Sequence, residues 1–321
     1  MRRTGGWVNR AIGVATVLAC SAACDRGSRG AASSGAPAAE APVAITEKWR
    51  AKHEADYRRD WVSIAGLFAL KPGANTVGSA PANDIVLPAS TPARVGRFLL
   101  AKHQVRFEPA AGVTVAHNGK PVAAAVDLKD DSTPGDDELT IGDVRLTIHA
   151  SGEQLGLRVR DPNGPLARGF LGFTWFPIDL QYRVTGRFIR DADPKPMKVI
   201  NTFGDLDEYK TEGVVEFTLM GQTVRLRPFT TRPNRFYFVF RDASSGQETY
   251  ETARFLYSDL LADGTTVLDF NQAYNPPCAF NPYTTCPIPL RENHLPVKVL
   301  AGEKAYPVHV PLGRPGGGGH P

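Results

Sequence analysis

Short apolar runs with a period of two, separated by turn residues, constrain the fold of this chain more than any other feature of its sequence. From Trp61 onward they include WVSIAGLFAL (61–70), QVRFEP (104–109), LTIGDVRLTIH (139–149) and LGLRVRD (155–161). Such runs with Gly, Pro, Asn or Asp between them predict short antiparallel strands. The 31 glycines and 26 prolines fit a chain with many turns and argue against a long helical bundle. We therefore predict a mainly β protein.

A single helix is predicted ahead of the strands, over residues 45–60. Thr46 is a candidate N-cap, because a threonine hydroxyl can accept a hydrogen bond from the first turn of a helix. Trp49, His53 and Tyr57 follow one another at intervals of four and therefore lie on one helix face. We expect this aromatic face to pack against the next domain, with His53 in a structural role.

The strand pattern divides into two antiparallel β units, at residues 61–164 and 165–306. In the second unit, residues 215–220 and 223–227 flank Gly221-Gln222, which predicts a hairpin. Further strands of this unit are predicted at residues 235–240, 249–257 and 265–271. We expect the first unit to be a β-sandwich and the second to be a β-sandwich or a small barrel.

Residues 1–24 have the features of a lipoprotein-type signal peptide. A start rich in arginine leads to the apolar run AIGVATVLA (11–19), which is too short to span a bilayer as a mature helix. Small residues come before Cys20 and Cys24, so either cysteine can carry the lipid, and we favour Cys24. An ordinary secretory signal cut near Ala23 is the alternative.

The segments at the two ends of the predicted folded part have the composition of unfolded chain. Residues 25–44 are rich in Gly, Ser, Ala and Pro and contain almost no large apolar side chains, which predicts a disordered linker. Residues 307–321 predict a flexible tail. Together with the signal peptide, the linker predicts a cell-envelope protein on the periplasmic or extracellular side, attached to the membrane through its lipid.

Charge and motifs exclude several classes of function. The formal net charge of +4 includes the arginines of the signal peptide, so the sequence predicts no basic surface for nucleic acid. No phosphate-binding loop, Gly-x-Ser-x-Gly, His-Glu-x-x-His or dinucleotide fingerprint occurs. The sequence therefore predicts no cofactor, and it leaves open whether the protein is an enzyme.

The segment from Leu268 to Pro296 combines many prolines with Cys278 and Cys286. Proline is excluded from helix interiors and central strands, so we predict a long ordered loop, called the Pro/Cys loop below. In an exported protein the two cysteines predict a disulfide. A metal site that also includes His294, and a redox-active or nucleophilic thiol, are the alternatives.

Polar side chains before and within the Pro/Cys loop form a predicted ligand pocket. Alternation along the strand expected at 249–257 would place Glu248, Tyr250, Thr252 and Arg254 on one face. The complete set of candidate pocket residues is Glu248, Tyr250, Arg254, Tyr257, Asp269, Asn271, Tyr274 and Asn275.

Three interpretations of this cluster are open. The first is a pocket that binds a small polar ligand, or an envelope protein as partner. The second is a hydrolase-type enzyme in which Asp269 or Glu248 acts as general acid or base and Arg254 holds an anionic substrate. The third is a buried hydrogen-bond network that only fixes the loop.

The run DFNQAYNPPCAFNPYTTCPIP (269–289), together with GQETYETARFLY (246–257) and the segment around NDIVLP (83–88), is similar to one bacterial and archaeal family. This family is called the domain of unknown function number sixteen eighty-four, and the resemblance spans residues 50–304. It implies no established activity.

Residues 66–161 resemble a forkhead-associated domain. The similarity rests on the opening from Leu70 to Asn75, on Gly78 followed by the segment 83–87, and on the Asn118-Gly119 turn. The phosphothreonine-reading residues of that family do not carry over, because Ser79 stands where the family has an arginine. The resemblance implies a sandwich that serves structure or protein contact.

Overall fold

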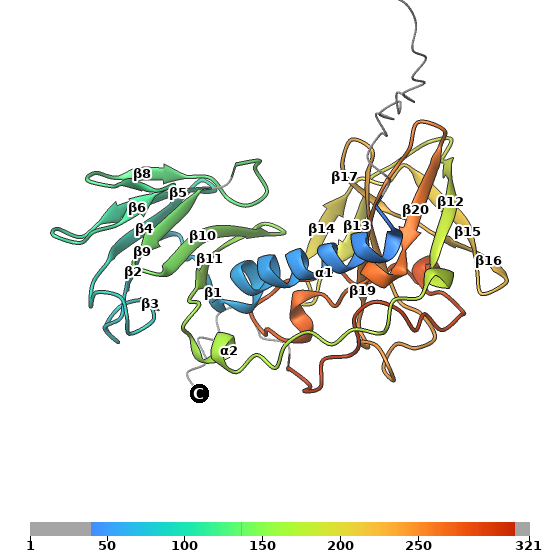
Figure 1. Ribbon diagram of the computed structural model, residues 1–321. Coiled ribbons are helices and arrows are strands. Elements are labelled where there is room, and N and C mark those ends of the chain that lie inside the picture. The colour runs from blue at the N-terminus through green and yellow to red at the C-terminus, as the bar shows by residue number, and fades with distance from the viewer. Residues whose placement is uncertain (1–39, 136, 312–321) are drawn as a thin grey trace, which may run out of the picture. The chain divides into compact units, whose positions relative to one another are not determined.

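The computed structural model describes residues 40–135 and 137–311 (Figure 1). The expected signal peptide, both candidate lipidation sites, most of the expected linker and most of the expected tail lie outside these residues. From Glu40 onward the chain forms one compact unit. Within the two described ranges, no helix has both the length and the apolar character needed to cross a membrane.

The first β part consists of eleven strands. Their bounds are β1 Ile64–Ala69, β2 Gly73–Gly78, β3 Ile85–Val86, β4 Gly96–Ala101, β5 Gln104–Pro109, β6 Ala116–His117, β7 Lys120–Pro121, β8 Val126–Leu128, β9 Glu138–Ile141, β10 Val144–Ser151 and β11 Gln154–Arg160. One sheet has the order β1-β11-β10-β9-β6-β7 and the other β3-β2-β4-β5-β8 (Figure 1). All pairings are antiparallel except that of β2 with β3. The predicted mainly β, antiparallel fold is therefore confirmed.

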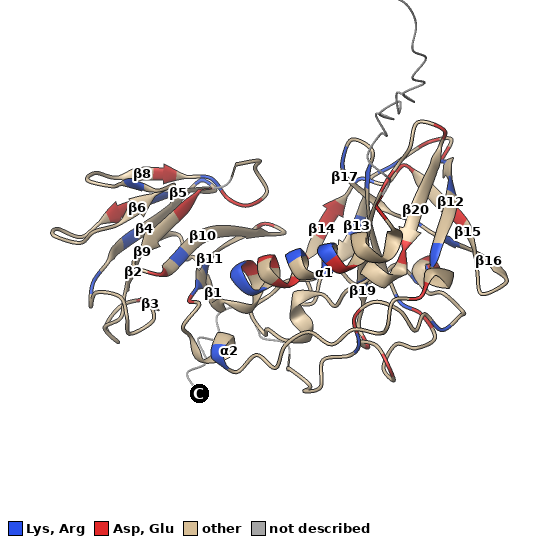
Figure 2. Cartoon of the chain, in the orientation of Figure 1, with Lys and Arg blue, Asp and Glu red and all other residues tan. Residues whose placement is uncertain are grey.

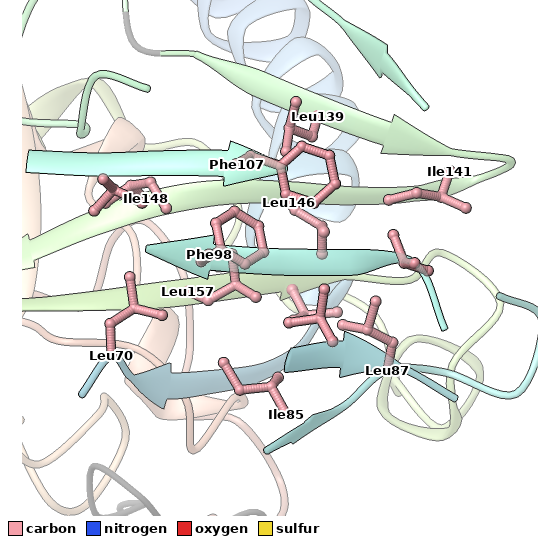
Figure 3. Packing of buried hydrophobic residues seen from close by; sticks show 14 of the residues in the cluster. Leu70, Ile85, Leu87, Phe98, Phe107, Leu139, Ile141, Leu146, Ile148 and Leu157 are labelled. Atoms are coloured by element: carbon pink, nitrogen blue, oxygen red, sulfur yellow. The ribbon is translucent and has the colours of Figure 1, made fainter. Parts of the chain in front are cut away.

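The two sheets enclose an apolar core (Figure 3). Phe98 of β4 and Phe107 of β5 are fully buried, with ring centroids 5.0 Å apart, and they pack in one cluster with Leu146 of β10 and Leu157 of β11. Burial of each such side chain contributes about 1.5–3 kcal/mol. The alternation in the sequence arises because every second side chain of these strands enters this core.

Helix α1 spans Pro42–Tyr57 and continues into one π-helical turn at Arg58–Val62. It begins three residues earlier than predicted, because a proline fits the first turn of a helix and Ala41 is the N-cap. The prediction of Thr46 as N-cap is therefore wrong. Its side chain is buried instead, and its hydroxyl donates to Asp269 Oδ2 at 3.0 Å.

The aromatic face of α1 is packed, but against the second β part and not against the first, which follows the helix in the chain. The ring centroids of Trp49 and His53 are 4.7 Å apart, and those of His53 and Tyr57 are 4.4 Å apart. Tyr274 of the Pro/Cys loop contacts all three rings, with centroid distances of 6.0, 4.5 and 5.5 Å. This stack joins the helix to a segment more than two hundred residues later in the chain.

The second β part follows a short helix, α2 (Pro165–Arg168). Its strands are β12 Arg183–Arg190, β13 Met197–Ile200, β14 Leu206–Tyr209, β15 Gly213–Leu219, β16 Gln222–Leu226, β17 Phe229–Arg232, β18 Arg235–Phe240, β19 Arg254–Asp259 and β20 Thr265–Asp269. They form a four-stranded sheet (β16-β15-β12-β20), a three-stranded sheet (β17-β18-β19) and the pair β13-β14. The Pro/Cys loop follows β20 and contains only short 3₁₀ turns and isolated bridges.

The three-stranded sheet is buried on both faces. Phe236, Phe238 and Phe240 of β18 belong to a core shared with the four-stranded sheet. Tyr237 and Val239 point to the opposite side and pack in a second core with α1 and the Pro/Cys loop. This explains why RFYFVF is apolar at almost every position, since a strand covered on both faces has no polar side.

Two local predictions differ from the structure. The predicted turn at Gly221-Gln222 is shifted by one residue, because Leu219 pairs with Gln222 and the turn is Met220-Gly221. Both turn residues have positive φ, +50° and +78°, as a type I′ turn requires. The strand predicted at 249–257 begins only at Arg254.

Polar contacts join the two β parts. Asn281 of the Pro/Cys loop donates to the carbonyl of Ile64 at 2.8 Å. Ser151 of β10 donates to Asp205 at 2.7 Å and accepts from Asn201 at 3.0 Å. The two parts have separate apolar cores, and hydrogen bonds connect them.

The buried His53 makes the stability depend on pH. Burial lowers its pKa from 6.5 to about 4, so the unfolded chain binds a proton between these values and the folded chain does not. This contribution is complete above pH 6.5 and is lost as the pH falls toward 4. The difference corresponds to roughly 3 kcal/mol, since one pKa unit is about 1.4 kcal/mol.

Urea unfolding at several pH values tests this contribution of His53. His53→Leu should flatten the dependence of the free energy of unfolding on pH between 6.5 and 4, whereas His309→Leu, which changes an exposed histidine, should not. Equal slopes in both variants would contradict this.

Candidate functional site

The eight predicted pocket residues do not meet in one cavity. Arg254 belongs to a buried ion pair, Asn271, Tyr274 and Asn275 lie inside the Pro/Cys loop, and Tyr257 and Asp269 line a cavity beside α1. Glu248 and Tyr250 lie outside these three environments. The expectation that Glu248, Tyr250, Thr252 and Arg254 share one strand face is wrong, because residues 242–253 are irregular. Asp242, Ser244 and Thr249 bond to one another there and hold the chain in a turn.

Arg254 is completely buried. Its Nη1 donates to Asp242 Oδ2 and to the carbonyl of Val299, each at 2.9 Å, and its Nη2 donates to the carbonyl of Ala301. The side chains of Arg254 and Asp242 are both 0% exposed. Arg254 therefore cannot reach a ligand from solvent, and it ties the carboxy-terminal segment to β19.

Glu248 lies at the surface, and Tyr250 lies over the loop. Glu248 Oε1 accepts from Lys298 Nζ at 2.8 Å, and both side chains are partly exposed. The Tyr250 hydroxyl is 3.5 Å from the carbonyl of Cys278 and 3.8 Å from its Sγ. Neither residue lines the cavity that contains Asp269, so Glu248, Arg254 and Asp269 do not converge as the hydrolase alternative requires.

Asn271, Tyr274 and Asn275 fix the loop from inside. Asn271 bonds to the backbone of Asp179 in both directions, accepting from its N–H at 2.9 Å and donating to its carbonyl at 2.8 Å. The buried Oδ1 of Asn275 accepts no hydrogen bond. The backbone N–H of Asn275 donates to Glu303 Oε2 at 2.8 Å. Burial raises the pKa of Glu303 to about 8. These bonds satisfy the buried backbone of an irregular segment.

Asp269 and Tyr257 line a cavity with a volume of about 310 Å³. It lies between the first half of α1 and strands β12, β18, β19 and β20. Its walls are Ile45, Trp49, Arg183, Arg235, Tyr257, Ser258, Asp259, Leu261, Val267, Asp269 and Gln272. A cavity of this size is at the lower end of the range for small-ligand sites.

Two arginines of this cavity have hydrogen-bond donors that no protein group uses. Arg183 Nε is 3.7 Å from Asp269 Oδ2, which is beyond hydrogen-bond distance, and the side chain donates to no acceptor within residues 40–135 and 137–311. Arg235 donates through Nη1 to both oxygens of Asp259 at 2.9 Å, and its buried Nε has no partner. The Tyr257 ring lies against Arg235, whose Cζ is 5.0 Å from the ring centroid.

Sequence reasoning missed Arg183, Arg235 and Trp49 as cavity residues. Basic and acidic residues are interspersed along α1 and the strands, so charge alone does not single out these arginines (Figure 2). They meet because β12 pairs with β20 and α1 packs over that edge. Strands β12 and β18 each begin with an arginine, and this was the one signal in the sequence that could have indicated the two cavity arginines.

The predicted disulfide is not formed in the structure, where Cys278 and Cys286 are free, buried thiols. Burial, together with a hydrogen bond to Cys286, raises the pKa of Cys278 well above its ordinary value. A thiol held neutral in this way is a poor nucleophile. Among the residues that the structure describes, no three His, Cys, Asp or Glu side chains are placed to hold a metal ion.

The buried ion pair of Arg254 with Asp242 should contribute much more to stability than the exposed pair of Lys298 with Glu248. Asp242→Asn leaves the buried Arg254 without its counter-charge and should lower the free energy of unfolding by about 3–5 kcal/mol. Glu248→Gln removes only the exposed partner of Lys298 and should cost less than about 1 kcal/mol. Urea unfolding of the two variants measures both values. A cost for Asp242→Asn as small as that for Glu248→Gln would contradict the structural role of Arg254.

Several solved structures are similar to the chain. One is the solution NMR structure of an uncharacterized protein from gene locus rrnAC0354 of Haloarcula marismortui, with 30% identity, a TM-score of 0.37, and coverage of 45% of this chain and 82% of that one. The FhaA FHA domain complexed with the intracellular domain of Rv3910 is 17% identical, with a TM-score of 0.21 and coverage of 29% and 86%. The FHA domain of CT664 from Chlamydia trachomatis is 17% identical, with a TM-score of 0.22 and coverage of 30% and 95%.

A search of the curated proteins returned no match. The family model described as "Protein of unknown function (DUF1684)" matches residues 168–304. This range includes every strand from β12 to β20, the buried Arg254 pair and the Pro/Cys loop. The expected resemblance is thus confirmed over residues 168–304, and this part of the chain matches the DUF1684 family.

Proposed function

We propose that this protein is an exported, lipid-anchored protein of the cell envelope that binds a small anionic ligand in the cavity beside α1. The observation that carries the proposal is the pair of guanidinium groups, Arg183 and Arg235, with unused donors in one cavity. The buried Nε of Arg235 has no partner, and an unpaired buried donor is costly. The donors of Arg183 are open to water, which an anionic ligand can replace.

The chemistry of the cavity walls defines the ligand further. A carboxylate or phosphate group matches the planar fork of a guanidinium and forms charge-assisted hydrogen bonds with it. Trp49 and Tyr257 supply aromatic surface for a flat or apolar part of the ligand. Asp259 and Asp269 balance the charge of the two arginines, which limits binding to ligands that place their anionic group near Arg183.

The hydrolase alternative based on Glu248, Arg254 and Asp269 has no support in this geometry. Arg254 is enclosed with Asp242, Glu248 pairs with Lys298, and only Asp269 faces the cavity. A general acid and a substrate-binding arginine must converge on one accessible position. We therefore assign binding, not acid–base chemistry, to this region.

Phenyl phosphate tests the cavity, because it combines a phosphate with an aromatic ring. Titration calorimetry with the full chain should give binding that Arg183→Gln weakens roughly tenfold to a hundredfold, as expected for one lost charge-assisted bond. The matched control is Arg187→Gln, which lies on the same strand outside the cavity and should bind like the parent chain. Phenol, which lacks the phosphate, should bind more weakly than phenyl phosphate. Equal affinities of the two arginine variants, or no binding at millimolar concentration, would refute the site.

Export and lipid attachment rest on the amino-terminal sequence, and they imply an oxidising compartment. Mass spectrometry of the protein isolated from bacterial membranes should find the segment before Cys24 removed and a lipid on Cys24. Cys24→Ala should abolish the lipid, whereas Cys20→Ala should not. The thiols of Cys278 and Cys286 are free in the structure but hydrogen-bonded to each other, so our proposal implies that they are oxidised to a disulfide after export. In urea they should then react with iodoacetamide only after reduction. An unmodified amino-terminal segment would contradict the anchor, and thiols that react without reduction would contradict the disulfide.

A further inference from the structure

Three polar side chains outside this cavity form a hydrogen-bonded chain. His149 of β10 lies between Asp131, in the turn after β8, and Thr285 of the Pro/Cys loop. The distance from His149 Nδ1 to Asp131 Oδ2 is 2.7 Å, and that from Nε2 to Thr285 Oγ1 is 2.9 Å. A hydroxyl, an imidazole and a carboxylate in this order are the parts of a nucleophilic triad.

The protonation of this chain follows from its partners. Burial would raise the pKa of Asp131, but His149 and Arg158 lower it to about 2, so Asp131 is ionised and can only accept. Burial and the charge of Arg158 lower the pKa of His149, which keeps the imidazole neutral. Nδ1 must then carry the proton toward Asp131, and Nε2 accepts from the Thr285 hydroxyl.

Each member is held in place by further bonds. Asp131 Oδ1 accepts from the N–H of Ala150 at 3.0 Å, and Asp131 Oδ2 accepts from Arg158 Nη1 at 2.8 Å. On both sides of Thr285 the loop is tied down, since Thr284 donates to the carbonyl of Asn281 and the N–H of Cys286 donates to Thr202. Such support fixes the geometry that a nucleophile and its base require.

The surroundings of Thr285 suit a developing negative charge. Its side chain is partly exposed, and its own N–H has no acceptor among residues 40–135 and 137–311. The free N–H of a nucleophilic residue is a donor that oxyanion sites use. Beside His149 lies a small cavity of about 20 Å³, also lined by Ser151, Gln154 and Asp205, which is large enough for one water molecule.

We propose that Thr285, His149 and Asp131 form a nucleophilic site that cleaves esters by acyl transfer. Thr285 Oγ1 bonds to the carbonyl carbon of the ester while its proton moves to His149 Nε2. The bond to the leaving alcohol then breaks, and the alcohol takes this proton. Water attacks the acyl-threonine, His149 accepts one proton of that water and returns it to Thr285, and a carboxylic acid leaves. Asp131 orients His149 and stabilises its protonated form.

A fluorophosphonate probe and 4-nitrophenyl acetate test the site in the full chain. We expect covalent labelling of the peptide that contains residue 285, both in the parent chain and in Thr285→Ser. Thr285→Val should abolish labelling, and His149→Gln should lower the rate of acetate ester cleavage by about a hundredfold or more. The control Thr133→Val removes an exposed hydroxyl from the turn of Asp131 and should change neither readout.

Thermal unfolding of each variant separates loss of chemistry from loss of fold. Thr285→Val retains the shape of threonine, so a folded variant without labelling supports the nucleophile. If neither the parent chain nor Thr285→Ser is labelled at residue 285, or if His149→Gln cleaves the ester as fast as the parent chain, the proposal is overturned. The three side chains would then serve only to join β10 to the Pro/Cys loop.

Discussion

Burial of the sheet β17-β18-β19 on both faces determines how the second half of the chain is arranged. Phenylalanines of β18 face one core and Tyr237 and Val239 face another, so this sheet needs two covers. The four-stranded sheet provides one, and α1 with the Pro/Cys loop provides the other. A helix near the amino terminus and a loop near the carboxy terminus therefore meet, and the Tyr57 hydroxyl donates to the carbonyl of Asn275 at 3.1 Å.

The density of polar residues around the loop follows from the same arrangement. A cover made of irregular chain buries backbone groups that no helix or sheet satisfies, and side chains must pair with them. Arg254 pairs with two carbonyls of the carboxy-terminal segment, and Asn293 donates to the carbonyls of Arg227 and Val239. In this chain, the polar residues around the loop are thus a consequence of folding an irregular segment into the interior.

Regular strands could be predicted from the sequence, but contacts between segments that are far apart in the chain could not. The run RFYFVF predicted β18 with its observed bounds, since local alternation and apolarity define a strand. The start of β19 was missed because hydrogen bonds of Asp242 and Thr249 override a plausible strand pattern. Of the predicted pocket residues, Asp269 and Tyr257 line the cavity, whereas its walls from α1, β12 and β18 come from pairings that no local pattern encodes.

Comparison of the arginines separates structural from binding roles better than residue type does. Arg254 has no exposed surface and donates to three acceptors of the protein, so its charge is already committed to the fold. Arg183 has a side chain that is 36% exposed and its nearest carboxylate oxygen is 3.7 Å away. The Arg183 guanidinium is therefore open to solvent, and its donors are not committed to the fold. In our proposal these donors bind the anionic ligand, in the cavity beside α1 and not within the polar network of the loop.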